Sequence, residues 1–440
     1  MERLLTTARR YLGAARRAQP LKVQGRVTQV LGLVIEGLGP ASSVGGACVI
    51  LPQHGAAGVP AEVVGFRDQR ILLMPLGELR GIGPGSTILS RNSVATTPVG
   101  PKLLGRVLNG LGEPIDGRGP LEAETAYPLY AEPLNPMTRR RLREPLDVGV
   151  KAINGLLTIG KGQRLALMAG SGVGKSVLLG MIARFTTADV NVIALVGERG
   201  RELREFLEND LGAAGLRRSV VVCATSDQPP LIRMRAAYVA TAVAEYFRGC
   251  GRDVLLLMDS LTRFAMAQRE VGLAIGEPPT SRGYTPSVFA LLPKLLERAG
   301  NAAEAGSITG IYTVLVEGDD MDEPIADAVR SILDGHVELS RELAARNHFP
   351  AINVLRSLSR PMKDVVPPEH LEWAGRLRRI AATYAEAEDL INIGAYVRGS
   401  NVRIDDAIDR IGAVNDFLQQ RVEVGASMQA TVEQLRGVVA

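Results

Sequence analysis

The chain has 440 residues, of which 46% are hydrophobic and 22% are charged, and its formal net charge is +4. This length exceeds one ordinary domain, and the composition is typical of globular proteins, which excludes a largely disordered chain. Three cysteines outside any CxxC pair exclude a zinc site and a disulfide framework, and no apolar run reaches the roughly 18 residues of a membrane span.

Residues 1–20 predict one short, basic, amphipathic helix. Leu5, Ala8 and Leu12 recur at helical spacing, and arginines occupy much of the remaining surface. Two interpretations stay open: a partly disordered basic tail, or a helix that docks on a partner or on an anionic membrane surface. The segment lacks the apolar region of a secretory signal, so we expect a cytoplasmic protein.

Residues 21–95 predict a small β-barrel. Short β-rich runs such as AEVVGF and RILLMPL are separated by turns that contain Gly and Pro. Phe66 is the only aromatic residue between Leu21 and Ser93. Since binding of single-stranded nucleic acid relies on aromatic stacking, a barrel that binds oligonucleotides is disfavoured.

Residues 96–368 predict an α/β domain with a parallel sheet. Continuously apolar runs such as VNVIALV and DVLLLMD alternate with helical stretches, as buried parallel strands joined by crossover helices do. Residues 369–440 contain no further β run. Ile404, Ile408 and Ile411 fall on one helical face, which extends to Leu418 and Val422 and predicts a helical C-terminal domain.

A phosphate-binding loop is predicted after the strand-like run Arg164–Met168. The sequence AGSGVGKS is followed by a helical stretch and has the phosphate-loop pattern, with Ala169 in place of the first Gly. Small residues let consecutive backbone N–H groups surround phosphates, and the start of the helix adds free donors. In such a loop Lys175 reaches the β- and γ-phosphates, and Ser176 binds Mg²⁺. The predicted nucleotide-binding residues are Ala169, Gly170, Ser171, Gly172, Val173, Gly174, Lys175, Ser176 and Val177.

Three carboxylates follow apolar runs and are candidates for the remaining chemistry. Asp259 ends the run that begins at Val254, where a carboxylate holds Mg²⁺ and its waters; a helix N-cap is the alternative. Glu198 is the candidate base for the attacking water, and Glu202 is a candidate for holding a metal-bound water. For this pair the alternative is a charged, solvated loop. An arginine is also needed for the γ-phosphate, but the pattern alone selects none.

Longer stretches, in the same order along the chain, resemble the catalytic subunits of rotary ATP synthases and their protein-export relatives. They are GERGRE (197–202), VLLLMDSLTRFA (254–265), GEPPTSRGYTPSVFALLPKLLERAG (276–300) and PAINVLRSLS (350–359), with LLGRVLNGLGEPIDG (103–117) belonging to the same pattern. Within this superfamily, GSGVGKS, LERAG and SLSR are most similar to the ATPases of type III protein export. Residues 72–86 look more like the flagellar branch than the branch of the virulence injectisome.

The resemblance implies an ATPase that uses ATP and Mg²⁺. It implies a RecA-like P-loop core between an N-terminal β-barrel and a C-terminal helical domain, assembled as a homohexamer. Glu198 would activate water, and Arg360 would be an arginine finger that reaches the next subunit's site. The remaining implied positions are Arg199, Glu202 and Arg263 around the γ-phosphate and metal, and Phe349 with the weaker candidate Tyr396 at the adenine base.

The expected function is ATP hydrolysis that energises export of flagellar proteins, with chaperone release and unfolding of substrates at the export gate. Alternatives are an injectisome ATPase, a catalytic subunit of a rotary synthase and a hexameric RNA translocase. Ala169 and the absence of an acidic DELSEED-like segment disfavour the synthase. Expected partners are a stalk or regulator protein at the N-terminal helix, gate membrane proteins and chaperone–substrate complexes, with peripheral association at the inner membrane and no nucleic acid.

Overall fold

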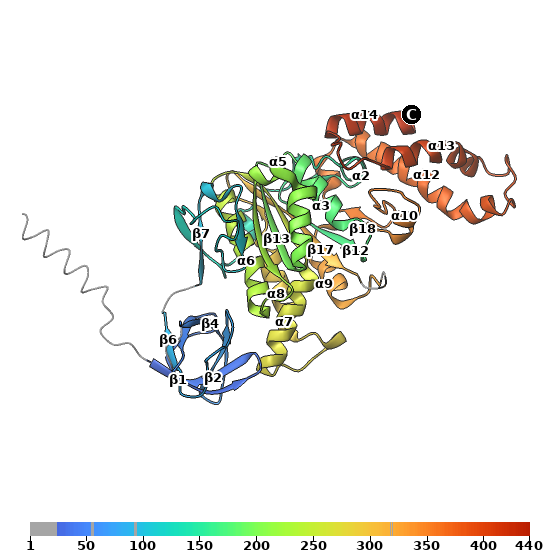
Figure 1. The fold of residues 1–440 in the computed structure, drawn as a ribbon. Helices are drawn as coiled ribbons and strands as arrows, with labels where there is room; N and C mark the ends of the chain where they lie inside the picture. The colour runs from blue at the N-terminus through green and yellow to red at the C-terminus, as the bar shows by residue number, and fades with distance from the viewer. Residues whose placement is uncertain (1–23, 54–56, 92–94, 317, 319) are drawn as a thin grey trace, which may run out of the picture. The chain divides into compact units, whose positions relative to one another are not determined.

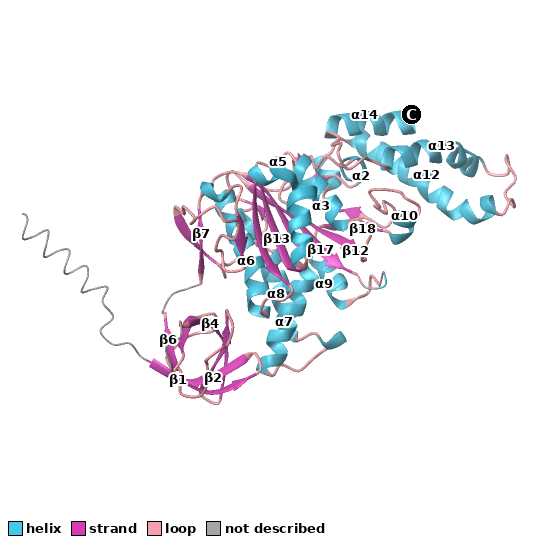
Figure 2. Cartoon of the chain, in the orientation of Figure 1, coloured by secondary structure: helices cyan, strands magenta, loops and turns pink. Residues whose placement is uncertain are grey.

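The computed structural model describes residues 24–53, 57–91, 95–316, 318 and 320–440, and the predicted helix at residues 1–20 lies outside these ranges. The chain forms two compact units, which are drawn in Figures 1 and 2. One unit contains the residues up to 95 together with 274–276, and the other contains 96–273 and 277–440. Within the described ranges, no helix combines the length and the apolar character needed to cross a bilayer.

The first unit is a closed β-barrel, as predicted. Its strands pair in the order β1-β2-β5-β4-β3-β6. Alternate residues point inward, so that side chains such as Val27, Ile35, Ile50, Leu73 and Ile88 form one buried core. Closure leaves no strand edge unpaired. The strands are β1 (Gln24–Leu31), β2 (Val34–Leu38), β3 (Ala47–Leu51), β4 (Val59–Arg67), β5 (Arg70–Pro75) and β6 (Thr87–Ser90).

The second unit is built on a mostly parallel sheet with the strand order β19-β18-β12-β17-β15-β13-β14-β8. Strands β18 to β8 pair in parallel, whereas β19 and the short β16 pair antiparallel with β18 and β17. The strands are β8 (Val107–Asn109), β12 (Arg164–Ala169), β13 (Val190–Glu198), β14 (Ser219–Thr225), β15 (Asp253–Asp259), β16 (Gly300–Asn301), β17 (Ser307–Leu315), β18 (Gly335–Leu339) and β19 (Leu358–Ser359). Small two-stranded pairs join β7 (Thr96–Val99) to β9 (Thr125–Pro128) and β10 (Pro145–Leu146) to β11 (Ile159–Gly160).

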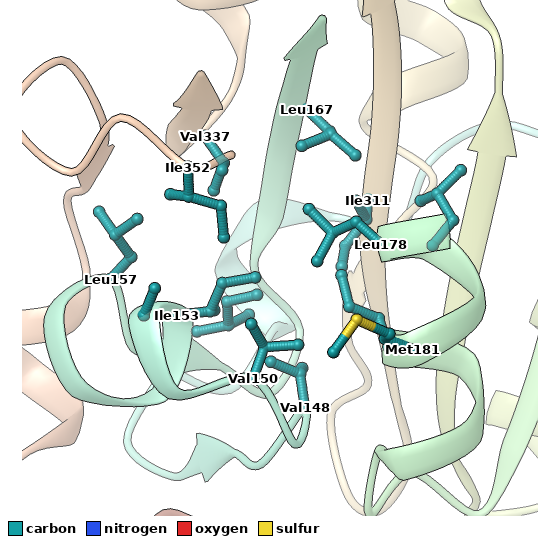
Figure 3. Packing of buried hydrophobic residues seen from close by; sticks show 14 of the residues in the cluster. Val148, Val150, Ile153, Leu157, Leu167, Leu178, Met181, Ile311, Val337 and Ile352 are labelled. Carbon is teal, nitrogen blue, oxygen red and sulfur yellow. The ribbon is translucent and has the colours of Figure 1, made fainter. Parts of the chain in front are cut away.

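Helices cover both faces of this sheet. The almost fully buried α6 packs along β13, β14 and β15, while α2 and α3 lie over the opposite face. Figure 3 shows the core on the α2 and α3 side, where Ile153, Leu178 and Met181 meet Leu167 and Ile311 of the sheet. The helices of this part are η1 (Pro101–Leu103), η2 (Pro136–Thr138), α2 (Lys151–Leu156), α3 (Lys175–Phe185), α4 (Gly200–Glu205), η3 (Phe206–Leu211), α5 (Gly212–Arg217), α6 (Pro230–Gly249), α7 (Leu261–Ile275), η4 (Ser281–Gly283), α8 (Pro286–Leu296), α9 (Pro324–Ile332), α10 (Arg341–Ala345) and α11 (Met362–Val365).

The chain ends in the helices α12 (Pro368–Asn392), α13 (Val402–Leu418) and α14 (Met428–Val439), which confirms the predicted helical C-terminus. The predicted apolar face of α13 needs a correction. The buried side chains are those of Ala407, Val414, Phe417 and Leu418, and the isoleucines at positions 404, 408 and 411 flank them half-buried. Residue 422 lies beyond the end of the helix, because the chain turns extended at its C-cap, Gln419.

Candidate functional site

The phosphate loop joins the end of β12 to the start of α3 (Figure 1). Gly172 and Gly174 adopt left-handed backbone angles, with φ of +80° and +87°, which residues with a Cβ rarely adopt. Ala169 is the last residue of β12 and pairs with Leu315, so its backbone is ordinary strand. This explains why the first position of the loop accepts Ala in place of Gly.

Lys175, the first residue of α3, extends from the loop to two carboxylates. Its ammonium contacts the buried carboxylate of Asp259, and its Nζ lies 3.7 Å from Glu198 Oε1. Glu198 and Asp259 end β13 and β15, and Lys175 follows the loop after β12; they meet because the carboxyl ends of these parallel strands lie together. The structure therefore brings the sequence-predicted lysine and both carboxylates together.

Thr313 is a member of this cluster that the sequence reasoning missed. Its hydroxyl donates a hydrogen bond of 2.6 Å to Asp259 Oδ1. Thr313 lies on β17, which is inserted in the sheet between β12 and β15. The available signal was a hydroxyl near the end of the apolar run ITGIYTVLV, but the position of that run between the two functional strands is not a local property of the sequence.

The two interpretations of Asp259 are separated by the hydrogen bonds around it. The backbone N–H of Arg263 donates to the hydroxyl of Ser260 at 3.2 Å, so Ser260 caps the start of α7. The carboxylate of Asp259 is instead directed at Lys175 and Thr313. It is therefore part of the polar cluster at the loop.

Glu198 is a half-buried carboxyl whose pKa is raised to about 7. Burial is the largest cause; the negative charge of Asp259 and the neighbouring Glu202 act in the same direction, and the positive charge of Lys175 opposes them. Its Oε1 is buried and has no hydrogen-bond partner among the described residues. A carboxyl that titrates near neutral pH and has an oxygen without a hydrogen-bond donor is suited to accept a proton from water.

Arg263 packs against the strand end that carries Glu198, and Arg199 directly follows Glu198 in the chain. The Arg263 side chain packs so closely on Gly197 that a Cβ there would come within 2.9 Å of it, and its buried Nε has no partner in the described chain. Arg199 is exposed and pairs at 3.5 Å with Glu202 on the first turn of α4. Arg263 thus packs against the residue before Glu198, and the guanidinium group of Arg199 pairs with the carboxylate of Glu202.

Phe349 supplies an exposed ring beside the loop. A Cβ on Gly174 would lie 3.6 Å from its Cε1, and 39% of the residue is accessible. Val177 is also exposed, on the first turn of α3. Tyr396 follows the end of α12 at Asn392, and its hydroxyl donates to the carbonyl of Asn401 and contacts Asp405. Phe349 is therefore the ring that the structure brings to the loop.

Arg360 lies at the end of the sheet where β12 and β18 begin, whereas the phosphate loop lies at the end where β12 finishes. Its backbone N–H donates to the carbonyl of Asp334 at 3.0 Å, just before β18 begins. Asp334 also accepts from the backbone of Arg164, the first residue of β12, whereas the loop follows the last residue of that strand. Arg360 is exposed and lines a cavity of about 760 Å³ together with Arg141 and Arg143. It is too far along the strand to act on the loop of its own chain.

Two protein-family models match parts of the second unit. Residues 149–359 match the ATP synthase alpha/beta family, nucleotide-binding domain, and residues 366–437 match the T3SS EscN ATPase C-terminal domain. The first match contains the phosphate loop, Glu198 and Asp259.

Relatives match over nearly the whole chain. The "Flagellum-specific ATP synthase" of Bacillus subtilis is 55% identical, and the "Type 3 secretion system ATPase" of Xanthomonas euvesicatoria is 54% identical. Each alignment covers 94% of this chain, and 94% and 93% of the two relatives. The solved structure of the assembled ATPase EscN from enteropathogenic E. coli is similar with a TM-score of 0.90 at 45% identity, over 94% of this chain and 100% of that one. The chain therefore belongs to the ATP synthase α/β family and, within it, to the ATPases of flagellar and type III secretion export.

Proposed function

We propose that this ATPase hydrolyses ATP, with Mg²⁺ beside the nucleotide, to energise the type III export of flagellar proteins. The observation that carries the chemistry is the meeting of Lys175, Asp259 and Glu198 at the phosphate loop. A lysine for the phosphates, a carboxylate for the metal ion and a carboxyl that titrates near neutral pH are the parts that transfer of a phosphoryl group to water requires.

The phosphates bind to the N–H groups of the loop, residues 169–176, and to Lys175. The ammonium now contacts Asp259, and the phosphates of a bound nucleotide compete for it with their larger negative charge. Ser176 and Asp259 offer oxygen ligands for Mg²⁺, and Glu202 is near enough to Glu198 to hold a metal-bound water. This small number of protein ligands is sufficient for Mg²⁺, because the ion usually keeps several waters and also binds phosphate oxygens. When bound, it neutralises charge on the β- and γ-phosphates.

Glu198 is the general base in this proposal. Its Oε1, which accepts no hydrogen bond from the described residues, takes the proton of the attacking water, and its raised pKa keeps the carboxylate and its protonated form close in energy at neutral pH. Arg263 and Arg199 bind the γ-phosphate and the shell of water around the metal. Phe349 stacks on the base, with Val177 beside it, because both present exposed apolar surface next to the loop.

Arg360 completes the site of a neighbouring subunit. Its place at the far edge of the sheet and its exposure support action in trans. When each subunit contributes its arginine to the next subunit's site, the same contact repeats from subunit to subunit and can close into a ring. The solved structures of EscN are those of the assembled ATPase and of its complex with the central stalk EscO. By this similarity we propose that the present chain also assembles, as a homohexamer, and that it binds a stalk partner.

In the cell, we propose a cytoplasmic protein that is peripherally associated with the inner-membrane export apparatus. The barrel at 21–95, the catalytic domain at 96–368 and the helical domain at 369–440 act on chaperone–substrate complexes and gate proteins, and residues 1–20 dock on a stalk or regulator protein. The flagellar assignment depends on residues 72–86, since identities to the two branches are nearly equal, at 55% and 54%. An injectisome ATPase is therefore the second candidate.

The decisive experiment is swimming motility of the source organism that carries a chromosomal Glu198→Gln substitution, with the protein level checked by blot. We expect loss of motility at a normal protein level. The purified variant should still bind ATP, which separates a chemical defect from misfolding. Normal swimming together with loss of effector secretion would transfer the assignment to the injectisome.

A further inference from the structure

The loop between α13 and α14, residues 419–427, crosses from Phe349 to the helices α2 and α3; we call it the strap. Gln420 is the residue that makes these connections. Its backbone N–H donates to the carbonyl of Phe349 at 3.0 Å. Its side-chain Nε2 donates to the carbonyls of Gly149 and Val424, both at 2.7 Å, and its Oε1 accepts from the N–H of Lys151 at 2.8 Å.

The amide of Gln420 is thus bonded on both donors and on its oxygen. The partners fix its orientation, because the nitrogen faces two carbonyls and the oxygen faces an N–H group. Gly149 and Lys151 enclose the start of α2, whose neighbours Val148, Val150 and Ile153 are buried in the core of Figure 3. One end of this connection is therefore anchored in the rigid interior of the nucleotide-binding domain.

The strap is also attached to the last turn of α3, the helix that the phosphate loop begins. The guanidinium group of Arg184 donates to the carbonyl of Val422 at 2.8 Å. The N–H of Ala426 donates to the carbonyl of Gly149 at 3.0 Å. Through these bonds the strap spans the end of α3, the start of α2 and the main chain of Phe349.

We propose that Gln420 is a positioning residue for the nucleotide base. It holds the main chain of Phe349 relative to α2 and thereby fixes the place of the exposed ring beside Gly174. This inference rests on the proposed stacking of Phe349 on the base. The helical C-terminal domain would then contribute to the affinity for ATP through Gln420, although Gln420 itself touches no nucleotide.

The test compares steady-state ATP hydrolysis of the purified protein with that of Gln420→Ala. We expect KM for ATP to rise about five-fold, the effect of one net hydrogen bond, with kcat nearly unchanged. Gln420→Met, which fills a similar volume without hydrogen bonds, should give the same KM shift and guards against collapse of the loop. Gln429→Ala is the matched control, because Gln429 is exposed on α14 and bonds Glu433 only locally.

A double-mutant cycle with Phe349→Ala separates the inference from its premise. If Gln420 acts through the ring, Gln420→Ala should leave the KM of the Phe349→Ala protein unchanged. An equal KM rise in both backgrounds, or a fall of kcat at constant KM, would overturn the positioning role and leave the stacking role intact. An unchanged KM in Phe349→Ala alone would overturn stacking on the base, and the inference with it.

Discussion

Thr313 donates a hydrogen bond to Asp259 from the strand that separates β12 from β15. The carboxylate is therefore held between this hydroxyl and the ammonium of Lys175, which is itself only 3.7 Å from Glu198. Two neighbouring strands, β15 and β17, thus fix one carboxylate before any nucleotide arrives. Such preorganisation lets a group act without reorganisation during the reaction.

Replacing Thr313 by Val, which has the same shape and no hydroxyl, should lower kcat about tenfold, as expected for loss of a hydrogen bond to a charged group. The matched control is Thr309→Val on the same strand, where the hydroxyl accepts from the N–H of Gly162 far from the loop. Both variants should lose similar thermal stability, and only Thr313→Val should lose turnover. Equal kcat values for the two variants would remove Thr313 from the site.

The pKa of Glu198 predicts the pH dependence of turnover. In the proposed mechanism the carboxylate form is the base, so kcat/KM should rise with pH through about 7 and level off above pH 8. Glu198→Gln should abolish hydrolysis at every pH while binding of ATP persists. A profile without an inflection between pH 6 and 8 would argue that another group takes the proton.

The same residue predicts an effect on stability with a defined sign. Its pKa is raised in the folded protein above the ordinary value of 4.5, so its ionisation costs folding free energy as pH rises from 4.5 to about 7. Glu198→Gln should therefore raise Tm at pH 8 and leave it nearly unchanged at pH 4. Thermal unfolding of the nucleotide-free proteins measures this difference, and an equal shift at both pH values would contradict it.

Arg360→Ala should reduce ATP hydrolysis by roughly 10³-fold, the lower limit for loss of an arginine finger. Part of the activity should return when this protein is mixed with Lys175→Ala, because a mixed ring contains some sites with an intact loop and an intact neighbouring arginine. Arg356→Ala, an exposed arginine on the same segment, is the control and should keep its turnover. No recovery in mixed assemblies would leave action in trans without support.

A buried ion pair predicts where the catalytic unit is sensitive to mutation. Arg298 is 1% exposed and donates to both carboxylate oxygens of Glu245, at 2.9 and 2.6 Å. Removing one partner leaves an uncompensated buried charge, so Glu245→Ala should destabilise the protein by about 3–5 kcal/mol. The double variant Arg298→Met with Glu245→Leu should recover much of that loss in urea unfolding. A smaller loss in the single variant would mean that water reaches this arginine.

The parts of the site that follow strands could be predicted from the sequence alone. Apolar runs mark buried strands, and polar residues at their carboxyl ends fall at one edge of a parallel sheet, which places Lys175, Glu198 and Asp259 together. The barrel was predictable for a related reason, since a series of short β-rich runs between Gly and Pro turns is typical of a small barrel or sandwich. These inferences use only local patterns.

What the sequence could not supply is contact between distant segments. Thr313 was missed because the order of strands in the sheet is set by tertiary packing. Gln420 was missed because its partners, Phe349 and Gly149, are 71 and 271 residues away along the chain. The face of α13 was shifted for the same reason: helical periodicity gives the spacing of apolar residues, and the neighbouring helices decide which of them are covered.

The separation of Arg360 from the phosphate loop along β12 and β18 has a consequence for how activity scales with protein concentration. If Arg360 acts in trans as proposed, each chain carries one half of two different sites, and an open row of subunits leaves one loop and one arginine unmatched. Closing the ring removes this loss in a single step. Specific activity should therefore climb steeply as dilute chains assemble, and chains that are kept apart should be nearly idle.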